Sequence, residues 1–117
     1  MKLSEIAEAL GLQDLTPEVT APKAADVGRG YASDLLSDVL ANAPSGGVLV
    51  TVQVHLNVIA VAVHAGLTAV IFANGRTPDD AVRARAVEEG IPLYTSRAAA
   101  FELVGRLYAL GVRGGRM

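Results

Sequence analysis

The sequence predicts an α/β fold: a three-layer α/β/α sandwich whose mostly parallel sheet has about four to five strands. Two short β-branched runs, Val48–Val52 and Ala69–Ala73, flank a longer apolar segment, Leu56–Ala65. Continuous apolar runs of this kind are typical of parallel strands that are covered on both faces, and a right-handed crossover helix joins such strands. These segments therefore predict one βαβ unit, around which helices and strands continue to alternate.

Composition and charge restrict the classes of function. The chain has 117 residues, of which 51% are hydrophobic and 19% are charged, and its formal net charge is −2. We expect residues 1–117 to form a single domain. The negative balance argues against nucleic-acid binding, and the absence of cysteine excludes disulfides and thiolate chemistry. The longest uninterrupted apolar run, Val58–Val63, is far shorter than the roughly 18 residues of a membrane span. We expect a cytoplasmic protein without a signal peptide or a membrane partner.

The first part of the chain predicts one helix and a linker, which together occupy residues 1–17. Leu3–Leu10 has the apolar spacing of an amphipathic helix, Ser4 is the candidate cap, and Gly11 ends the helix. The same residues resemble the first helix of a helix-turn-helix, but no basic recognition helix follows them. We therefore interpret the segment as a helix that packs on the sheet.

Residues 18–32 carry two candidate edge strands, Glu18–Ala21 and Asp26–Ala32. Within them, Gly28–Ser33 approaches the dinucleotide-binding fingerprint G-x-G-x-x-G. A serine takes the place of the third glycine, however, and no clean apolar strand precedes the motif. We therefore interpret this stretch as a turn and not as a nucleotide-binding loop.

The remaining elements alternate as an α/β sheet requires. A helix at Ser33–Ala43 has Ser33 as its candidate cap and Asp34 in its first turn, where a carboxylate stabilises the helix dipole. An Asn74-Gly75 turn follows the strand that ends at Ala73. The last elements are a surface helix at Asp79–Glu89 capped by Thr77-Pro78, a strand at Ile91–Thr95, a helix at Ala98–Leu110 capped by Ser96, and a frayed tail at residues 111–117.

The Leu56–Ala65 helix is apolar on nearly every side. A helix of this kind is normally buried on more than one face, and in a small domain the sheet covers only one of them. We expect a second subunit to cover the other face, which predicts a homodimer through Leu56–Ala65. The alternative is that the N-terminal helix covers it.

Three polar loops are expected to meet at the carboxyl edge of the sheet, because parallel strands end on the same side. They are Gln53–Asn57, Asn74–Thr77 and Thr95–Arg97, with the helix start at Ser33 nearby. Their side chains, together with free N–H groups at helix starts, suit a phosphate, a carboxylate or a nucleotide, and we expect no cofactor other than such a ligand. The candidate ligand-binding residues are Ser33, Asp34, Gln53, His55, Asn57, Asn74, Gly75, Arg76, Thr95 and Ser96.

His55 has two interpretations. An imidazole exchanges protons near neutral pH, so His55 is a candidate general base or phospho-acceptor. The preferred interpretation is that His55 and Asn57 cap the helix that follows. A triad of His55 with Ser33 and Asp34 lacks a nucleophile elbow, and the two adjacent side chains point in different directions. His55 and His64 lie nine residues apart without a carboxylate at helical metal-site spacing, so we expect neither catalysis nor a metal.

Four stretches of the chain resemble the DRTGG domain family, and more narrowly its stand-alone bacterial members. The resemblance covers about residues 3–110, and its motifs occur in the family's order. The literal Asp-Arg-Thr-Gly-Gly string is absent, and Asp26-Val-Gly-Arg-Gly30 is similar to a degraded form of it. The four stretches are Gly30–Ala43, Gln53–Val58, Val70–Gly75, and Glu89–Leu93 running on to Ala100–Leu103.

The resemblance implies an α/β fold similar to the N-terminal domain of HPr kinase/phosphorylase. In larger proteins DRTGG domains accompany CBS or phosphotransacetylase domains as regulatory or oligomerising parts, and stand-alone members occur near genes of iron-only hydrogenases and anti-sigma-type kinases. The resemblance therefore implies a non-catalytic regulatory or protein-interaction module, accessory to a hydrogenase or a signalling protein. The alternatives are a nucleotide- or small-anion-sensing domain and, less favoured, a phospho-carrier or enzyme that uses His55.

Overall fold

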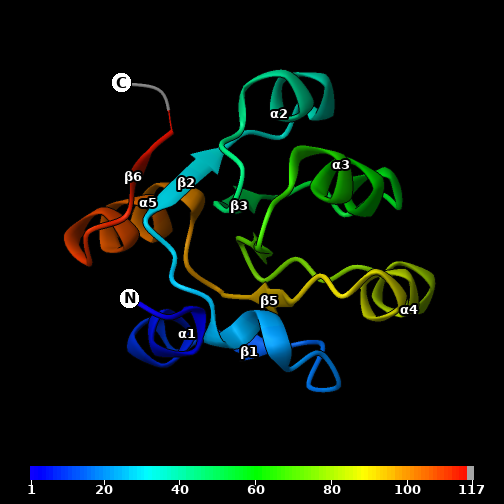
Figure 1. Cartoon of the computed structure of the whole chain (residues 1–117), viewed down its shortest axis with the longest axis horizontal. Coiled ribbons are helices and arrows are strands. Elements are labelled where there is room, and N and C mark those ends of the chain that lie inside the picture. The colour runs from blue at the N-terminus through cyan, green and yellow to red at the C-terminus, as the bar shows by residue number, and fades with distance from the viewer. Residues whose placement is uncertain (116–117) are drawn as a thin grey trace.

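The computed structural model of the protein describes residues 1–115 and contains one six-stranded sheet, ordered β1-β5-β4-β3-β2-β6 (Figure 1). Its strands are β1 (Gln13–Asp14), β2 (Arg29–Ala32), β3 (Val48–Thr51), β4 (Ala69–Phe72), β5 (Leu93–Thr95) and β6 (Arg113–Gly114). Its helices are α1 (Leu3–Leu10), a short 3-10 helix (Ala21–Ala24), α2 (Leu36–Asn42), α3 (Asn57–Ala65), α4 (Asp80–Glu89) and α5 (Ala100–Ala109).

The predicted βαβ unit is confirmed. Strands β3 and β4 are parallel, with Val48 opposite Ala69 and Thr51 opposite Phe72, and α3 forms the connection between them. All residues of both strands are buried, as expected of β-branched runs covered on both faces. The strands β2, β3, β4 and β5 run in one direction, so their carboxyl ends share one edge of the sheet.

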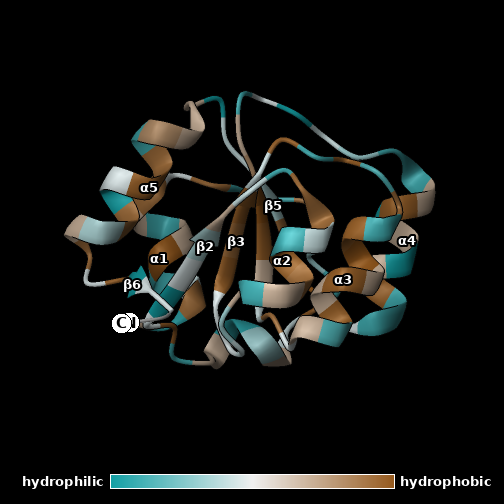
Figure 2. Cartoon of the chain, turned by 90° about the horizontal axis from the view of Figure 1, so that it is seen from above, coloured by the Kyte–Doolittle hydropathy of each residue, from teal (hydrophilic) through white to brown (hydrophobic). Residues whose placement is uncertain are grey.

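Helices cover both faces of the sheet, which gives the predicted three layers (Figures 1 and 2). On one face, α1 and α5 contribute Leu3, Ile6, Leu103 and Leu107 to a core cluster with alternate residues of the strands. On the other face, α2, α3 and α4 pack against the strands through a second cluster, which includes Val39, Val58, Ile59, Val82 and Ala86. Alternation along each central strand therefore divides the core in two.

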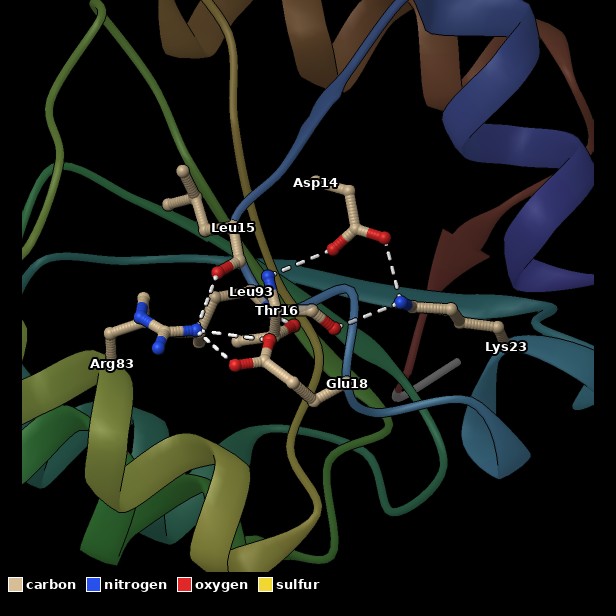
Figure 3. A network of polar contacts seen from close by, with 7 residues as sticks. All are labelled: Asp14, Leu15, Thr16, Glu18, Lys23, Arg83 and Leu93. Carbon is tan, nitrogen blue, oxygen red and sulfur yellow. Dashed lines mark hydrogen bonds and ion pairs between the residues drawn. The ribbon is translucent and has the colours of Figure 1, made fainter.

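The edge strand predicted at Glu18–Ala21 is wrong. The segment between α1 and β2 contains the short strand β1 and the 3-10 helix instead. Polar contacts hold this segment against the rest of the molecule (Figure 3). Thr16 is fully buried, and its Oγ1 accepts a hydrogen bond of 3.0 Å from the Leu93 N–H. Lys23 Nζ lies 2.7 Å from an Asp14 carboxylate oxygen. Because these partners lie far apart in the sequence, no local pattern predicts them.

A second ion pair in Figure 3 joins this segment to α4. Arg83 donates hydrogen bonds of 3.0 and 2.8 Å to the two carboxylate oxygens of Glu18, and one of 3.4 Å to the Leu15 carbonyl. The hydrogen bond from Arg83 lowers the pKa of Glu18 below its ordinary value.

Several predicted helix caps are wrong. At α1 the Glu5 carboxylate, and not Ser4, accepts a hydrogen bond from the Lys2 backbone N–H, at 2.8 Å. At α4 the capping residue is Asp79, which accepts from the Val82 N–H at 3.1 Å, whereas Thr77-Pro78 precedes the cap. The predicted ends at Gly11 and Gly90 are confirmed: both glycines have the left-handed conformation that favours glycine.

The C-terminal tail is not frayed over its whole predicted length. Arg113–Gly114 forms β6, which pairs in parallel with Arg29 and Gly30 of β2. The prediction for residues 116–117 lies outside the described residues. Strands β1 and β6 extend the sheet to six strands, beyond the four to five that the sequence predicts, because two-residue strands carry no readable periodicity.

The apolar helix α3 is flanked by α2 and α4, and not by the N-terminal helix, which lies on the opposite face of the sheet. That alternative is therefore wrong. The outer side of α3 still exposes Leu56 at 47% and Val63 at 42%, and the homodimer through this helix stays a prediction. Among residues 1–115, no helix has the length and apolarity that a membrane span requires.

Candidate functional site

The predicted ligand-binding residues lie at or just after the carboxyl ends of the parallel strands, and this edge of the sheet is at the top of Figure 2. They fall into two groups. The first follows β2 and β3 and holds Ser33, Asp34, Gln53, His55 and Asn57. The second follows β4 and β5 and holds Asn74, Gly75, Arg76, Thr95 and Ser96.

In the first group, side chains hold the loops after β2 and β3 in place through hydrogen bonds within and between them. Asp34 Oδ1 accepts hydrogen bonds from Thr51 Oγ1 at 2.9 Å and from the Val52 N–H at 2.8 Å. Asp34 therefore joins the end of β2 to the end of β3, and α2 begins only at Leu36. Ser33 Oγ accepts from the Leu35 N–H at 3.2 Å. The predicted start of this helix at Ser33 is wrong for this reason.

In the loop between β3 and α3, side chains also accept hydrogen bonds from backbone N–H groups. The Gln53 Oε1 accepts a hydrogen bond of 3.1 Å from the His55 N–H, and His55 Nδ1 accepts one of 3.0 Å from the Asn57 N–H. A ring nitrogen that accepts a hydrogen bond carries no proton, so His55 satisfies an N–H group at the start of α3. This geometry agrees with the preferred interpretation of His55 as a cap. Within residues 1–115, Asp34 makes its hydrogen bonds to Thr51 and Val52 and not to His55, so no triad forms.

Beside the first group, α2 is joined to β2 through Asp38. Its carboxylate accepts hydrogen bonds of 2.8 Å from Asn42 Nδ2 and of 2.8 and 2.9 Å from Tyr31 Oη. Both sets of hydrogen bonds lower the pKa of Asp38, and the one from Asn42 has the larger effect. The carboxylate has a structural role in this contact.

In the second group, backbone bonds connect two loops. The Gly75 N–H donates to the Ser96 carbonyl at 2.7 Å, and Thr95 Oγ1 donates to the Arg76 carbonyl at 2.7 Å. The predicted Asn74-Gly75 turn is confirmed: both residues have positive φ values, 58° and 66°. The Asn74 N–H donates to the Ala98 carbonyl at 2.9 Å. These hydrogen bonds join the loops after β4 and β5 into one wall.

Beside this wall lies a polar cleft with a volume of about 640 Å³. The predicted residues Gly75, Thr95 and Ser96 line it. Asn74 and Arg76 of the same group do not line it. No residue of the first group lines it either, because the loops after β2 and β3 lie farther along the sheet edge. Thr77 and Arg97 also line the cleft; they lie in the predicted loops but not among the candidate residues. Sequence reasoning missed the four residues that complete the lining: Gly11, Gln13, Ala98 and Arg106.

The lining of the cleft carries two positive charges, from Arg97 and Arg106, and no carboxylate. Within residues 1–115, Arg97 makes no ion pair, and Arg106 Nε lies 3.8 Å from Glu102, with both side chains exposed. A solvent-exposed pair at this distance holds its partner weakly. In a chain with a net charge of −2, this local positive charge favours an anionic ligand.

Polar groups beside the arginines add hydrogen-bonding capacity. Thr77 and Ser96 offer hydroxyls, Gln13 offers an amide, and the cleft reaches Ala98, just before the first turn of α5. The lining contains no histidine, lysine or carboxylate that could serve as a general base. Among the described residues, no group of three His, Cys, Asp or Glu side chains could hold a metal ion. The two guanidinium groups and the hydroxyl and amide groups beside them can bind an anion.

No family model and no curated protein matches the chain. The solved structures that are similar in fold include the CBS and DRTGG domains of the regulatory region of Clostridium perfringens pyrophosphatase, complexed with activator, diadenosine tetraphosphate. The TM-score is 0.69 and the sequence identity is 16%, over 95% of this chain and 47% of that one. The chain thus spans about half the length of that structure. The likeness shows that this α/β fold occurs in a regulatory region.

Proposed function

We propose that the protein is a non-catalytic regulatory module, similar to DRTGG domains, that binds a small phosphate-bearing anion in the cleft beside Arg97 and Arg106. One observation carries the proposal: both charged side chains that line the cleft are guanidinium groups. Planar guanidinium groups bind phosphate oxygens through paired hydrogen bonds. Because the lining supplies no acid–base pair, the bound anion would act as a signal and not as a substrate.

The fold likeness supports the regulatory part of this proposal. The similar structure is a regulatory region that was complexed with a nucleotide activator. A module of this kind needs a partner that responds to its ligand state. A hydrogenase or a signalling protein is the partner class that the family resemblance implies. The hydrogen bond to His55 Nδ1 weighs against the phospho-carrier alternative, because that nitrogen is engaged at the start of α3.

A thermal-unfolding experiment tests the proposal. Orthophosphate, tripolyphosphate, AMP, ATP and diadenosine tetraphosphate would each be added to the wild-type chain. A ligand present at about ten times its dissociation constant adds about 1.4 kcal/mol to stability, which raises the unfolding temperature of a domain of this size by about 6 °C. We expect at least one polyphosphate or nucleotide to produce such a shift.

Three variants and one control show whether the shift comes from binding in the cleft. Arg97→Ala and Arg106→Ala should each reduce the shift, and the double variant should abolish it. Arg85→Ala is the matched control, because Arg85 also pairs with a glutamate four residues away, Glu89, but lies outside the cleft. If every ligand leaves the unfolding temperature unchanged, or if the double variant responds as the wild type does, the proposal is wrong.

A further inference from the structure

The two arginines of the cleft lie at different levels of α5. Arg97 belongs to the loop after β5, and α5 begins three residues later, at Ala100. Arg106 is the seventh residue of α5, so it lies about 9 Å farther along the helix axis than Ala100, at a rise of about 1.5 Å per residue. Both side chains are exposed, and both line the cleft. The positive charge of the cleft therefore comes from two levels along one helix.

The stem of Arg97 lies beside the wall that the loops after β4 and β5 form. A Cβ atom placed on Gly75 would lie 3.9 Å from Arg97 Cγ, so the Arg97 side chain passes close to the turn that contains Gly75. Arg106 lies instead on α5, one turn after Glu102. The two guanidinium groups thus reach the cleft from separate elements of the fold.

A ligand that binds both guanidinium groups has to extend along the cleft. The volume of the cleft, about 640 Å³, is within the range of about 300–1,000 Å³ that is usual for sites of small organic ligands. A single phosphate group meets both arginines only where their long side chains converge on one point, which restricts the rotamers of both. A chain of linked phosphoryl groups offers separate oxygen atoms to each arginine. The geometry therefore favours a phosphate chain over a single phosphate group.

The other polar side chains of the lining have hydrogen-bond donors to offer. Ser96 Oγ accepts a hydrogen bond of 3.1 Å from the Ala98 N–H, which leaves its own O–H group to donate. Within residues 1–115, the Thr77 hydroxyl and the Gln13 side-chain amide make no hydrogen bond. Phosphoryl oxygens are strong hydrogen-bond acceptors, and a phosphate chain carries several of them. The lining is therefore rich in the donors that such a chain requires.

Glu102 lies between the two arginines in the sequence and forms an ion pair with Arg106. Its carboxylate is 3.8 Å from Arg106 Nε, and both side chains are more than half exposed. An exposed pair of this kind is weak, so an anion can take the place of Glu102 beside Arg106. A ligand that reaches Arg106 therefore competes with Glu102, and this competition shows whether the ligand spans the cleft.

We propose that the ligand of the cleft is a linear chain of two or more linked phosphoryl groups, which extends from Arg97 to Arg106. Each guanidinium group binds the oxygens of a different phosphoryl group. Inorganic polyphosphates and the phosphate chain of a nucleoside triphosphate share this chemistry, whereas orthophosphate and nucleoside monophosphates lack it. The inference rests on the proposed function, because it names the ligand class of the same cleft.

Isothermal titration calorimetry at constant ionic strength, without divalent cations, tests the ligand class. Pyrophosphate, tripolyphosphate and ATP should bind about 10- to 100-fold more tightly than orthophosphate and AMP, because the second guanidinium group adds charge-assisted hydrogen bonds. ATP that binds more tightly than tripolyphosphate would assign the chain to a nucleotide, and equal dissociation constants would assign it to an inorganic polyphosphate. Orthophosphate and AMP that bind as tightly as the chains would overturn the inference and leave the proposed function standing. If no anion binds, both are wrong.

The two arginine variants test whether the chain spans the cleft. Arg97→Ala and Arg106→Ala should each raise the dissociation constant of tripolyphosphate by about tenfold or more, because each removes the partner of one phosphoryl group. Orthophosphate binds one guanidinium group at a time and should respond to one of the two variants at most. The control Arg85→Ala should leave both dissociation constants unchanged. If both variants weaken orthophosphate as much as tripolyphosphate, the two guanidinium groups converge on one phosphate and the inference is wrong.

Glu102→Gln tests the contact with Arg106 without removing a binding residue. The substitution should tighten tripolyphosphate binding by about threefold or more, because it removes a carboxylate that competes for Arg106 and repels the anion. Glu89→Gln is the matched control, since Glu89 pairs with Arg85 at 3.4 Å outside the cleft, and it should leave the dissociation constant within about twofold. Tripolyphosphate that binds Glu102→Gln no more tightly than the wild type would show that the chain does not reach Arg106, and would overturn the inference.

Discussion

His55 gives the sharpest test of how the loop after β3 is built. Its Nδ1 accepts a hydrogen bond from the Asn57 N–H at 3.0 Å, at an exposed helix start. The change is His55→Ala, which leaves that N–H without its protein partner. His55→Asn keeps an acceptor oxygen at about the same reach, and His64→Ala is a control at the other end of the same helix.

The expected loss can be worked out from this single bond. A side chain that satisfies an N–H group at a helix start contributes about 0.5–2 kcal/mol, and exposure places His55 in the lower half of that range, at about 1 kcal/mol. A chain of 117 residues unfolds with an entropy of about 0.25 kcal/mol/K. His55→Ala should therefore lower the unfolding temperature by about 4 °C, and His55→Asn by less than half of that.

Urea and thermal unfolding measure these differences, and incubation with labelled acetyl phosphate measures any chemical role. We expect His64→Ala to stay within about 0.5 kcal/mol of the wild type, because the His64 side chain is exposed near the end of α3. The reasoning is refuted if His55→Ala is as stable as the wild type. Phosphate label on the wild type that is lost in His55→Ala would support the phospho-carrier alternative instead.

Two further predictions concern the polar contacts that hold the fold. Thr16→Val leaves the Leu93 N–H without the acceptor now 3.0 Å away, and should lower the free energy of unfolding by about 1–3 kcal/mol because that contact is buried. Thr68→Val, in an exposed contact, should lower it by under about 1 kcal/mol. Equal losses of stability for the two variants in urea unfolding would contradict the buried role of Thr16. Hydrogen bonds lower the pKa of Glu18 and Asp38 below 4.5 and 3.8, so the folded state binds fewer protons than the unfolded state in this range. The stability from both groups is present above about pH 5 and is lost as the pH falls through their folded pKa values; unfolding free energies that rise on acidification below about pH 4.5 would refute this assignment.

The central sheet could be predicted because its signal is local. Val48–Val52 and Ala69–Ala73 are short β-branched runs, and the helix between them is long enough to cross over the sheet. Apart from the polar Thr51 and the partly buried Val52, these residues are apolar and buried by a helical layer, so nearly every position carries the apolar signal. β1 and β6 lacked that signal, because two residues show no periodicity and their pairing partners lie far away in the sequence.

The helix starts were less predictable because one polar side chain can bind several partners. Asp34 has the residue type of a first-turn carboxylate, but Thr51 and the Val52 N–H take its hydrogen bonds. Asp79 was expected inside the first turn of α4 and caps it instead. A sequence pattern fixes such positions to within a few residues, and the tertiary contacts decide among the available acceptors.

The sequence predicts binding residues at this edge of the sheet, and of the two arginines that line the cleft only Arg97 lies in one of the predicted loops. Parallel strands place Gly75, Thr95 and Ser96 on one side, as topology requires. Arg106 lies two turns into a helix whose pattern indicates only an amphipathic surface, and Gln13 belongs to a strand too short to predict. Both enter the cleft only through the packing of α1, β1 and α5 around the end of β5.

The most direct test of the account is a titration with tripolyphosphate followed by backbone amide chemical shifts of the ¹⁵N-labelled protein. We predict saturable shifts concentrated in the residues of the cleft and little change at Gln53–Asn57. Saturable shifts centred on Gln53–Asn57, or the absence of any saturable shift, would contradict the proposed binding site. The amides expected to move most are those of Gly11, Gln13, Gly75, Arg97 and Ala98.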